Sequence, residues 1–244
     1  MTLSKHQILG QPVNLSPDYW GWLVDRLDRG ISTHVVTMNA EMVMQANQNL
    51  ELAKILQQAD LIAADGAGIV LALKFYGINQ QRCAGIDLGA KLLELAGERG
   101  AACPVALYGG KPEVLPKAVA FWQNRLPELS IVAQADGYIS ESAQQELIAQ
   151  IQQQQPKIIM VALGIPRQEV WIAQNRHICP QAIWIGIGGS FDVWSGTKKR
   201  APKIFQKLNL EWLYRLGQEP SRWQRMLALP QFMLLAMGER LRGR

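Results

Sequence analysis

The amino-acid sequence predicts an α/β protein with a parallel sheet covered by helices on both faces, followed by a basic helical C-terminal appendage. Short apolar runs rich in branched residues alternate with longer amphipathic stretches, which is the pattern of strands and helices in a parallel sheet. Past about residue 194 the alternation stops, and basic segments broken by prolines follow. We therefore expect a Rossmann-like catalytic core over residues 1–194 and an appendage over residues 195–244.

Six apolar runs are predicted to be the strands of the sheet. They are residues 33–38, 60–65, 104–110, 130–135, 157–164 and 182–188. Amphipathic stretches between these runs have apolar residues at helical spacing and are predicted to be helices. They are residues 40–59, 88–100, 112–126 and 141–155.

Composition narrows the class of protein. The chain has 244 residues, of which 48% are hydrophobic, so it is long enough to bury a core. Its three cysteines include no Cys-x-x-Cys pair, which argues against a disulfide framework and a structural zinc site and favours a reducing cytosol. The N-terminus has no apolar region typical of a signal peptide, and no apolar run is long enough to span a bilayer.

The net charge of +5 is unevenly distributed. From Ser195 to the end there are eleven Lys and Arg against three Glu, so the basicity belongs to the tail. Such a tail suits nucleic acid, anionic lipid or a phosphorylated ligand, and the charge by itself does not choose among them.

The carboxyl ends of the predicted strands carry glycines and small polar residues. Ligands of open α/β sheets bind beyond these ends, where glycine lets the backbone approach a ligand. Each feature also has a plain structural explanation, since Asn39 is a natural helix N-cap and Gly109-Gly110 suits a tight turn. The candidate residues at these ends are Thr37, Asn39, Asp65, Gly66, Gly109, Gly110, Lys111, Gly137, Tyr138, Gly164, Gln168, Gly188, Gly189 and Asp192.

Two other classes of protein stay open on these residues. A NAD-type oxidoreductase is one, because Gly66 and Gly68 follow a strand and open a helix, with Asp87 downstream for a ribose contact. Against it, Leu71 stands where the third glycine belongs, and Asp65 would repel a pyrophosphate. A nucleic-acid-binding protein is the other, although no recognised module accompanies the basic tail.

Seven motifs, in order and spacing, carry a resemblance to a known family. They are TMNAEMV, ADGAGIV, CAGIDL, GGKPEV, LGIPRQEVW, GIGGSFDVWSGTKKRAP and LNLEWLYRLGQEPSRWQR, between about Thr33 and Arg225. The chain resembles the WecG/TagA/CpsF glycosyltransferases. The resemblance implies a bacterial enzyme that moves an N-acetylmannosamine-type sugar from a UDP donor to a lipid-diphosphate-linked GlcNAc acceptor in cell-surface polysaccharide synthesis. The implied transfer is inverting and needs no metal or cofactor.

The resemblance also implies a place in the cell. It points to a cytoplasmic protein held peripherally at the inner face of the cytoplasmic membrane, with an appendage that associates with the membrane and completes the active site. It implies no nucleic-acid partner and allows a homo-oligomer. The appendage interleaves aromatic and basic residues, which suits a membrane interface, although its apolar residues could equally pack on the core or on a neighbouring subunit.

The roles of the base and of the substrate-binding residues follow from the same resemblance. Asp65 matches the general base, and Gly66 and Gly68 are expected to make room for the sugar. Thr37, Asn39, Arg82 and Gln168 match substrate-binding positions. The sequence has no Asp-x-Asp pair, so backbone amides and cations would meet the diphosphate. Expected nucleotide-binding residues are Gly109, Gly110, Lys111, Gly164, Gly188, Gly189, Asp192, Arg215, Arg222 and Arg225.

Overall fold

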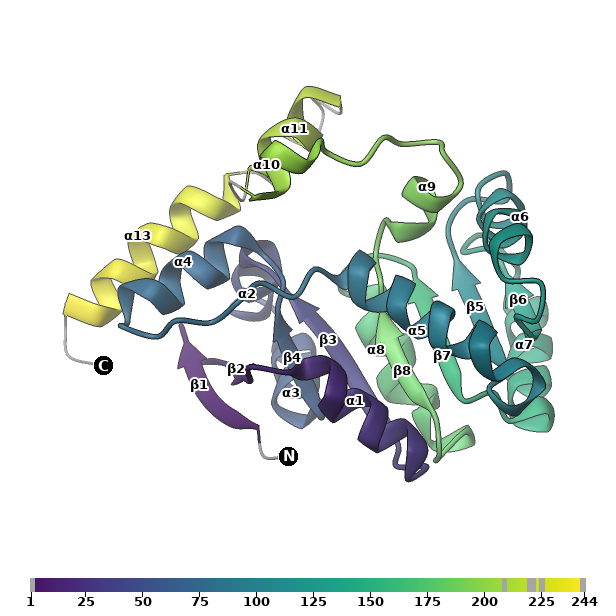
Figure 1. Cartoon of the computed structure of the whole chain (residues 1–244). Helices are drawn as coiled ribbons and strands as arrows, with labels where there is room; N and C mark the ends of the chain where they lie inside the picture. The colour runs from purple at the N-terminus through teal and green to yellow at the C-terminus, as the bar shows by residue number, and fades with distance from the viewer. Residues whose placement is uncertain (1–2, 208–209, 219–222, 224–226, 242–244) are drawn as a thin grey trace.

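The protein forms a parallel sheet between two layers of helices, with its C-terminal helices at one end (Figure 1). The structure is a computed structural model that describes residues 3–207, 210–218, 223 and 227–241, without the side chains of Lys207 and Arg215. The predicted α/β class is therefore confirmed.

The central sheet has six parallel strands in the described part of the chain, in the order β4-β3-β8-β7-β5-β6. All six predicted runs form strands, with slightly shorter bounds for five of them. In chain order these are β3 (Thr33–Met38), β4 (Leu61–Ala64), β5 (Val105–Gly109), β6 (Ile131–Ala135), β7 (Ile158–Ala162) and β8 (Ile183–Gly186).

Successive residues of each strand point to opposite faces of the sheet, and helices cover both faces, which is why the central strands are mainly apolar. In β3, Val35 packs in the cluster of one face and Val36 in a cluster of the other. The first face is covered by α1 (Tyr19–Asp28), α5 (Gly85–Arg99), α6 (Leu115–Arg125) and α9 (Ser190–Trp194). The second face is covered by α2 (Ala40–Ala46), α3 (Leu50–Gln58), α4 (Ala67–Phe75), α7 (Glu141–Gln154) and α8 (Arg167–Asn175).

The stretch 40–59, predicted as one helix, is two helices. The first, α2, ends at Ala46, and α3 begins after Asn49, whose side chain accepts a hydrogen bond from the Leu52 N–H at 3.1 Å. An Asn in this position competes for the backbone donors of the next turn and starts a new helix. Periodicity does not register such a break, because both helices bury the same kind of apolar face.

An antiparallel hairpin of β1 (Ser4–Ile8) and β2 (Gln11–Leu15) precedes the sheet and was not predicted. Its turn residues Leu9 and Gly10 both have positive φ, at 51° and 76°. Tight hairpin turns of this kind usually carry Asn-Gly, so a Leu at the first position hides the signal. The hairpin packs on the edge strand β4, where the Asn14 carboxamide accepts the Ile62 N–H at 2.7 Å.

The C-terminal segment contains α10 (Lys203–Lys207), α11 (Glu211–Gln218) and α13 (Ala228–Leu241). Helix α13 lies along α2 and α4 (Figure 1) and buries Phe232 and Ala236 in their apolar cluster. Near its end, Glu239 accepts hydrogen bonds from the Tyr76 hydroxyl at 2.6 Å and the Leu9 N–H at 3.0 Å. The sequence left open whether this segment packs on the core, on a neighbouring subunit or on lipid. In the structure, α13 packs on the chain's own core. Whether residues 195–244 act as a separate unit stays a prediction.

Candidate active site

A cavity of about 760 Å³ opens at the carboxyl ends of the strands. Its walls come from the residues after each of the six strands, from the starts of α2 and α5, and from Glu211, Trp212 and Leu229 of the C-terminal segment. Size and position suit a ligand of nucleotide dimensions.

The cavity brings together most of the residues that the sequence predicted. The predicted residues that line it are Thr37, Asn39, Asp65, Gly66, Gly68, Arg82, Gly110, Lys111, Gly137, Tyr138, Gly164, Gln168, Gly188, Gly189 and Asp192. Gly109 is not among the lining residues, and a side chain there would clash with the backbone of Ala162 on the neighbouring strand. Arg215 lies on α11 with its side chain outside the description, and Arg222 and Arg225 lie outside the described residues.

Asp65 follows β4 directly and is held at the strand end by its backbone. The N–H groups of Asp65 and Gly66 both donate to the Met38 carbonyl, at 3.0 and 3.1 Å. A Cβ on Gly66 would come within 2.8 Å of Asn39, and one on Gly68 within 2.6 Å of Leu229. Both glycines line the cavity, but the contacts that require glycine are with the protein itself.

Arg82, in the loop between α4 and α5, contacts both the backbone and the side chain of Asp65. Its Nε donates to the Asp65 carbonyl at 2.5 Å, and its Nη2 lies 3.3 Å from Asp65 Oδ1. The same Nη2 pairs with Glu211 of α11. Burial by itself would lower the pKa of Arg82, but the carboxylates of Asp65 and Glu211 outweigh burial and raise this pKa. The cavity therefore keeps a fixed positive charge next to the Asp65 carboxylate.

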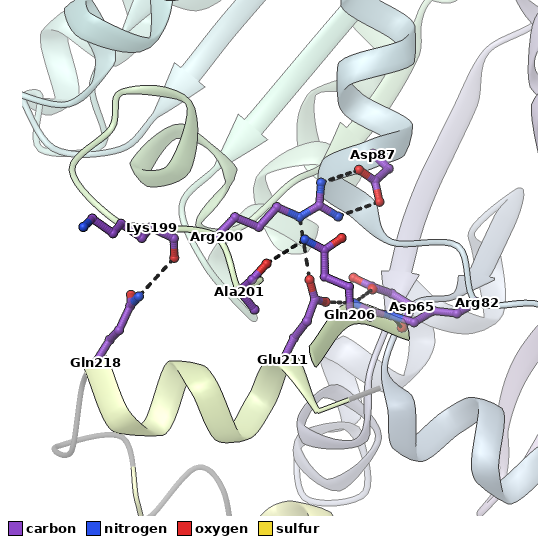
Figure 2. A network of polar contacts seen from close by, with 9 residues as sticks. All are labelled: Asp65, Arg82, Asp87, Lys199, Arg200, Ala201, Gln206, Glu211 and Gln218. Atoms are coloured by element: carbon purple, nitrogen blue, oxygen red, sulfur yellow. Dashed lines mark hydrogen bonds and ion pairs between the residues drawn. The ribbon is translucent and has the colours of Figure 1, made fainter. Parts of the chain in front are cut away.

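The pairing continues from Glu211 across to α5 (Figure 2). The Glu211 side chain is only 8% exposed, and its Oε1 lies 3.6 Å from Nε of Arg200. Arg200 in turn holds Asp87 with two hydrogen bonds, at 2.6 and 2.7 Å. Three carboxylates and two guanidinium groups thus alternate from α5 to the end of β4 and tie α11 to the cavity. Asp87 is engaged with Arg200 and does not line the cavity, which weighs against its role as a ribose acceptor.

The other lining groups are mostly engaged with the protein. Asn39 caps α2 by accepting the Met42 N–H at 2.9 Å, so its expected capping role coexists with its place in the cavity wall. The N–H of Gly110 donates to Ala162, and the N–H of Gly188 donates to Gln168 Oε1. Asp192 pairs with Lys198 at 3.0 Å.

Among the lining residues that were assigned no role in the site from the sequence are Arg167, Lys198, Glu211 and Trp212. Arg167 and Lys198 lie within the quoted motifs and add positive charge to the wall. Glu211 carried a weak signal, since it is an acid at the start of an otherwise basic helical segment.

The described residues contain no cluster of three or more His, Cys, Asp or Glu side chains placed to hold a metal ion. In the same part of the chain, every helix is too short or too polar to cross a bilayer.

A parallel sheet whose strand ends frame a polar cavity is typical of α/β enzymes that bind nucleotides. The family comparison narrows this class: the chain belongs to the glycosyl transferase WecG/TagA/CpsF family, whose model matches residues 6–244. The protein is therefore a glycosyltransferase, and the resemblance noted in the motifs is confirmed.

A characterised relative is the N-acetylglucosaminyldiphosphoundecaprenol N-acetyl-beta-D-mannosaminyltransferase of Bacillus spizizenii. It is 39% identical over 208 residues, which cover 85% of this chain and 79% of the relative. Its name describes transfer of N-acetylmannosamine to a lipid-linked N-acetylglucosamine.

Proposed function

We propose that the protein transfers an N-acetylmannosamine-type sugar from a UDP donor to a lipid-diphosphate-linked GlcNAc acceptor in cell-surface polysaccharide synthesis. The activity of the relative supports the sugar and the acceptor. The observation that carries the mechanism is a carboxylate, Asp65, at a strand end in a cavity large enough for a nucleotide sugar and clasped by a charged arginine.

In the proposed inverting transfer, Asp65 is the general base. It takes the proton of the acceptor hydroxyl while the acceptor oxygen bonds to the anomeric carbon, and the bond from that carbon to the UDP oxygen breaks with its electron pair going to UDP. The proton ends on Asp65 and the negative charge on the leaving diphosphate. A well-placed base contributes ~10² to 10⁴ in rate.

Cationic side chains are proposed to stabilise the leaving diphosphate without a metal. Lys111, Arg167 and Lys198 line the cavity and support this assignment. Arg215, Arg222 and Arg225 are proposed to join them from the C-terminal segment. Gly110, Gly164, Gly188 and Gly189 would let the nucleotide approach the backbone, and Asp192 would bind ribose or uracil.

Thr37, Asn39 and Gln168 are proposed to hold the sugar. All three are polar side chains near the carboxyl ends of the strands, and they line the same cavity as Asp65. Hydroxyl and carboxamide groups match the hydroxyl and acetamido groups of the donor.

The C-terminal segment is proposed to hold the protein peripherally at the inner face of the cytoplasmic membrane. On α13, Leu234 and Leu241 are 72% and 83% exposed, on a helix in a strongly basic segment. Apolar and basic side chains together favour an anionic bilayer surface. We expect flotation of the full chain with anionic liposomes, and a loss of flotation in the variant that carries Leu234→Asp and Leu235→Asp. Equal flotation of both proteins would contradict this part of the proposal.

The reaction is tested with a panel of UDP-sugars and a GlcNAc-diphospho-lipid analogue, following UDP release. We expect release with UDP-N-acetylmannosamine that depends on the acceptor. Release with no member of the panel, or release unaffected by the acceptor, would contradict the proposal. Fluorescence of bound NADH, measured in parallel, tests the oxidoreductase alternative.

A further inference from the structure

Beside the cavity, a glutamate and a histidine are buried together, and the proposed mechanism uses neither. His34 of β3 is 2% exposed and Glu169 of α8 is fully buried. His34 Nε2 lies 2.9 Å from Glu169 Oε2. A buried carboxylate is costly unless its oxygens are hydrogen-bonded, so the second oxygen of Glu169 must also find a partner.

That partner is Gln168, a residue of the cavity wall. Gln168 Nε2 donates to Glu169 Oε1 at 2.9 Å, and Gln168 Oε1 accepts the Gly188 N–H at 3.2 Å. A carboxylate accepts and a backbone N–H donates, so the carboxamide of Gln168 satisfies both in one orientation alone. A flipped amide would set its oxygen against the carboxylate and its NH₂ against the Gly188 N–H.

The end of β8 leaves room for these two side chains because residue 186 is a glycine. At Gly186, the last residue of β8, a Cβ would come within 2.6 Å of Glu169 Oε1 and would clash with Gln168 Nε2. The two side chains thus lie against the bare backbone of the strand end. The nitrogen of the Gln168 amide faces inward, and its oxygen lies next to Gly188, which lines the cavity.

We infer that Glu169, held by His34, is a positioning residue that orients Gln168 as a hydrogen-bond acceptor for the donor sugar. The amide oxygen accepts two hydrogen bonds, and Gly188 supplies one. The other suits an O–H or an acetamido N–H of the sugar. This inference rests on the proposed function, because it needs Gln168 to contact the sugar.

The first experiment compares binding of UDP with binding of UDP-N-acetylmannosamine by calorimetry. Replacing both members of the buried pair, with His34→Leu and Glu169→Met, removes the polar groups together and leaves no buried charge unpaired. We expect UDP affinity within about twofold of the wild type and an affinity for the nucleotide sugar about tenfold lower, the cost of one hydrogen bond. Gln168→Leu should show the same selective loss, and the triple variant no further loss.

The outcomes separate this inference from the proposed function. Nucleotide-sugar affinity within twofold of wild type in the His34→Leu, Glu169→Met variant, or an additive loss in the triple variant, overturns the positioning role. Unchanged affinity in Gln168→Leu overturns it too, because there is then no sugar contact to position. A wild-type protein that binds neither ligand overturns the proposed function instead.

A second measurement does not depend on the variants of the buried pair being folded. In ¹⁵N-labelled wild-type protein, the side-chain NH₂ of Gln168 is assigned by its absence in Gln168→Leu. We expect its protons to exchange with water at least about tenfold more slowly than those of the exposed Gln153. Exchange as fast as that of Gln153 overturns the inference, because an amide fixed between Glu169 and Gly188 is protected.

Discussion

The two sides of the cavity are built in different ways. At Asp65, a chain of ion pairs runs through Arg82, Glu211 and Arg200 to Asp87, and Glu211 and Arg200 come from the C-terminal segment. At Gln168, a buried chain of hydrogen bonds runs from His34 to Gly188 and belongs entirely to the sheet and its helices. The difference teaches that the proposed base depends on how the C-terminal segment docks, whereas the proposed sugar contact does not.

The largest effect on activity is expected from removing the proposed base. Asp65→Asn should fold normally and lose at least ~10² in kcat, because the amide cannot take the acceptor proton. UDP release measures the loss. Asp25→Asn, an exposed carboxylate on α1, is the matched control and should keep wild-type kcat. Near-normal activity of Asp65→Asn would remove Asp65 from its role.

The docking of α13 on the core is expected to stabilise the protein. Phe232→Ala should lower the free energy of unfolding by ~3–5 kcal/mol, because it empties a fully buried site between α13 and the core. Leu234→Ala, on the exposed side of the same helix, should stay within ~0.5 kcal/mol of wild type. Equilibrium unfolding in urea compares them. Equal stabilities would contradict the docking of α13.

The ion-pair chain that includes Glu211 is expected to affect catalysis. Glu211→Gln leaves Arg82 with Asp65 as its remaining carboxylate in the chain and should lower kcat about tenfold through a misplaced base. Affinity for UDP-N-acetylmannosamine should change little, since Gln168 is held from the other side. Glu239→Gln, which removes the carboxylate charge that accepts hydrogen bonds from Tyr76 and Leu9 near the end of α13, is the control for a general effect on stability. A kcat equal to that of the control would show that α11 does not organise Asp65.

The smallest expected effect is on the alkylation rate of Cys83, which depends on the charge of Asp65. Burial, assisted by the Asp65 carboxylate, raises the pKa of Cys83 to about 12, so its thiol is almost entirely neutral at pH 8. Alkylation by iodoacetamide should be slow in the wild type. Asp65→Asn removes a negative charge, lowers the pKa of Cys83 and should speed alkylation by a few-fold. An unchanged rate would contradict the proximity of the two groups.

Much of this architecture was predictable because parallel sheets have a strong local signature. Strands buried on both faces are continuous apolar runs, and their carboxyl ends meet at one edge, so Thr37, Asp65 and Gln168 could be placed together from spacing and motifs. The hairpin was not predicted, because Leu9 adopts a left-handed conformation and is not a characteristic turn residue. The helix break after Ala46 was not predicted, because capping by Asn49 does not alter the spacing of apolar residues.

The parts of the site that could not be predicted depend on long-range pairing. Nothing near Glu211 in the sequence indicates that it meets Arg82, which lies far earlier in the chain. Glu169 stands beside Gln168 in a recognised motif, but its partner His34 is on a distant strand. Contacts of this kind arise from the order of strands in the sheet and from the docking of α11, which periodicity does not encode.

The central claim is that Asp65 takes the acceptor proton beside a bound nucleotide sugar. A crystal structure with UDP and a GlcNAc-diphospho-lipid analogue tests it most directly. We expect the Asp65 carboxylate ~2.6–3.2 Å from the acceptor hydroxyl, or one water away, with UDP in the cavity at the strand ends. UDP bound elsewhere, or an acceptor hydroxyl out of reach of Asp65, would contradict the claim.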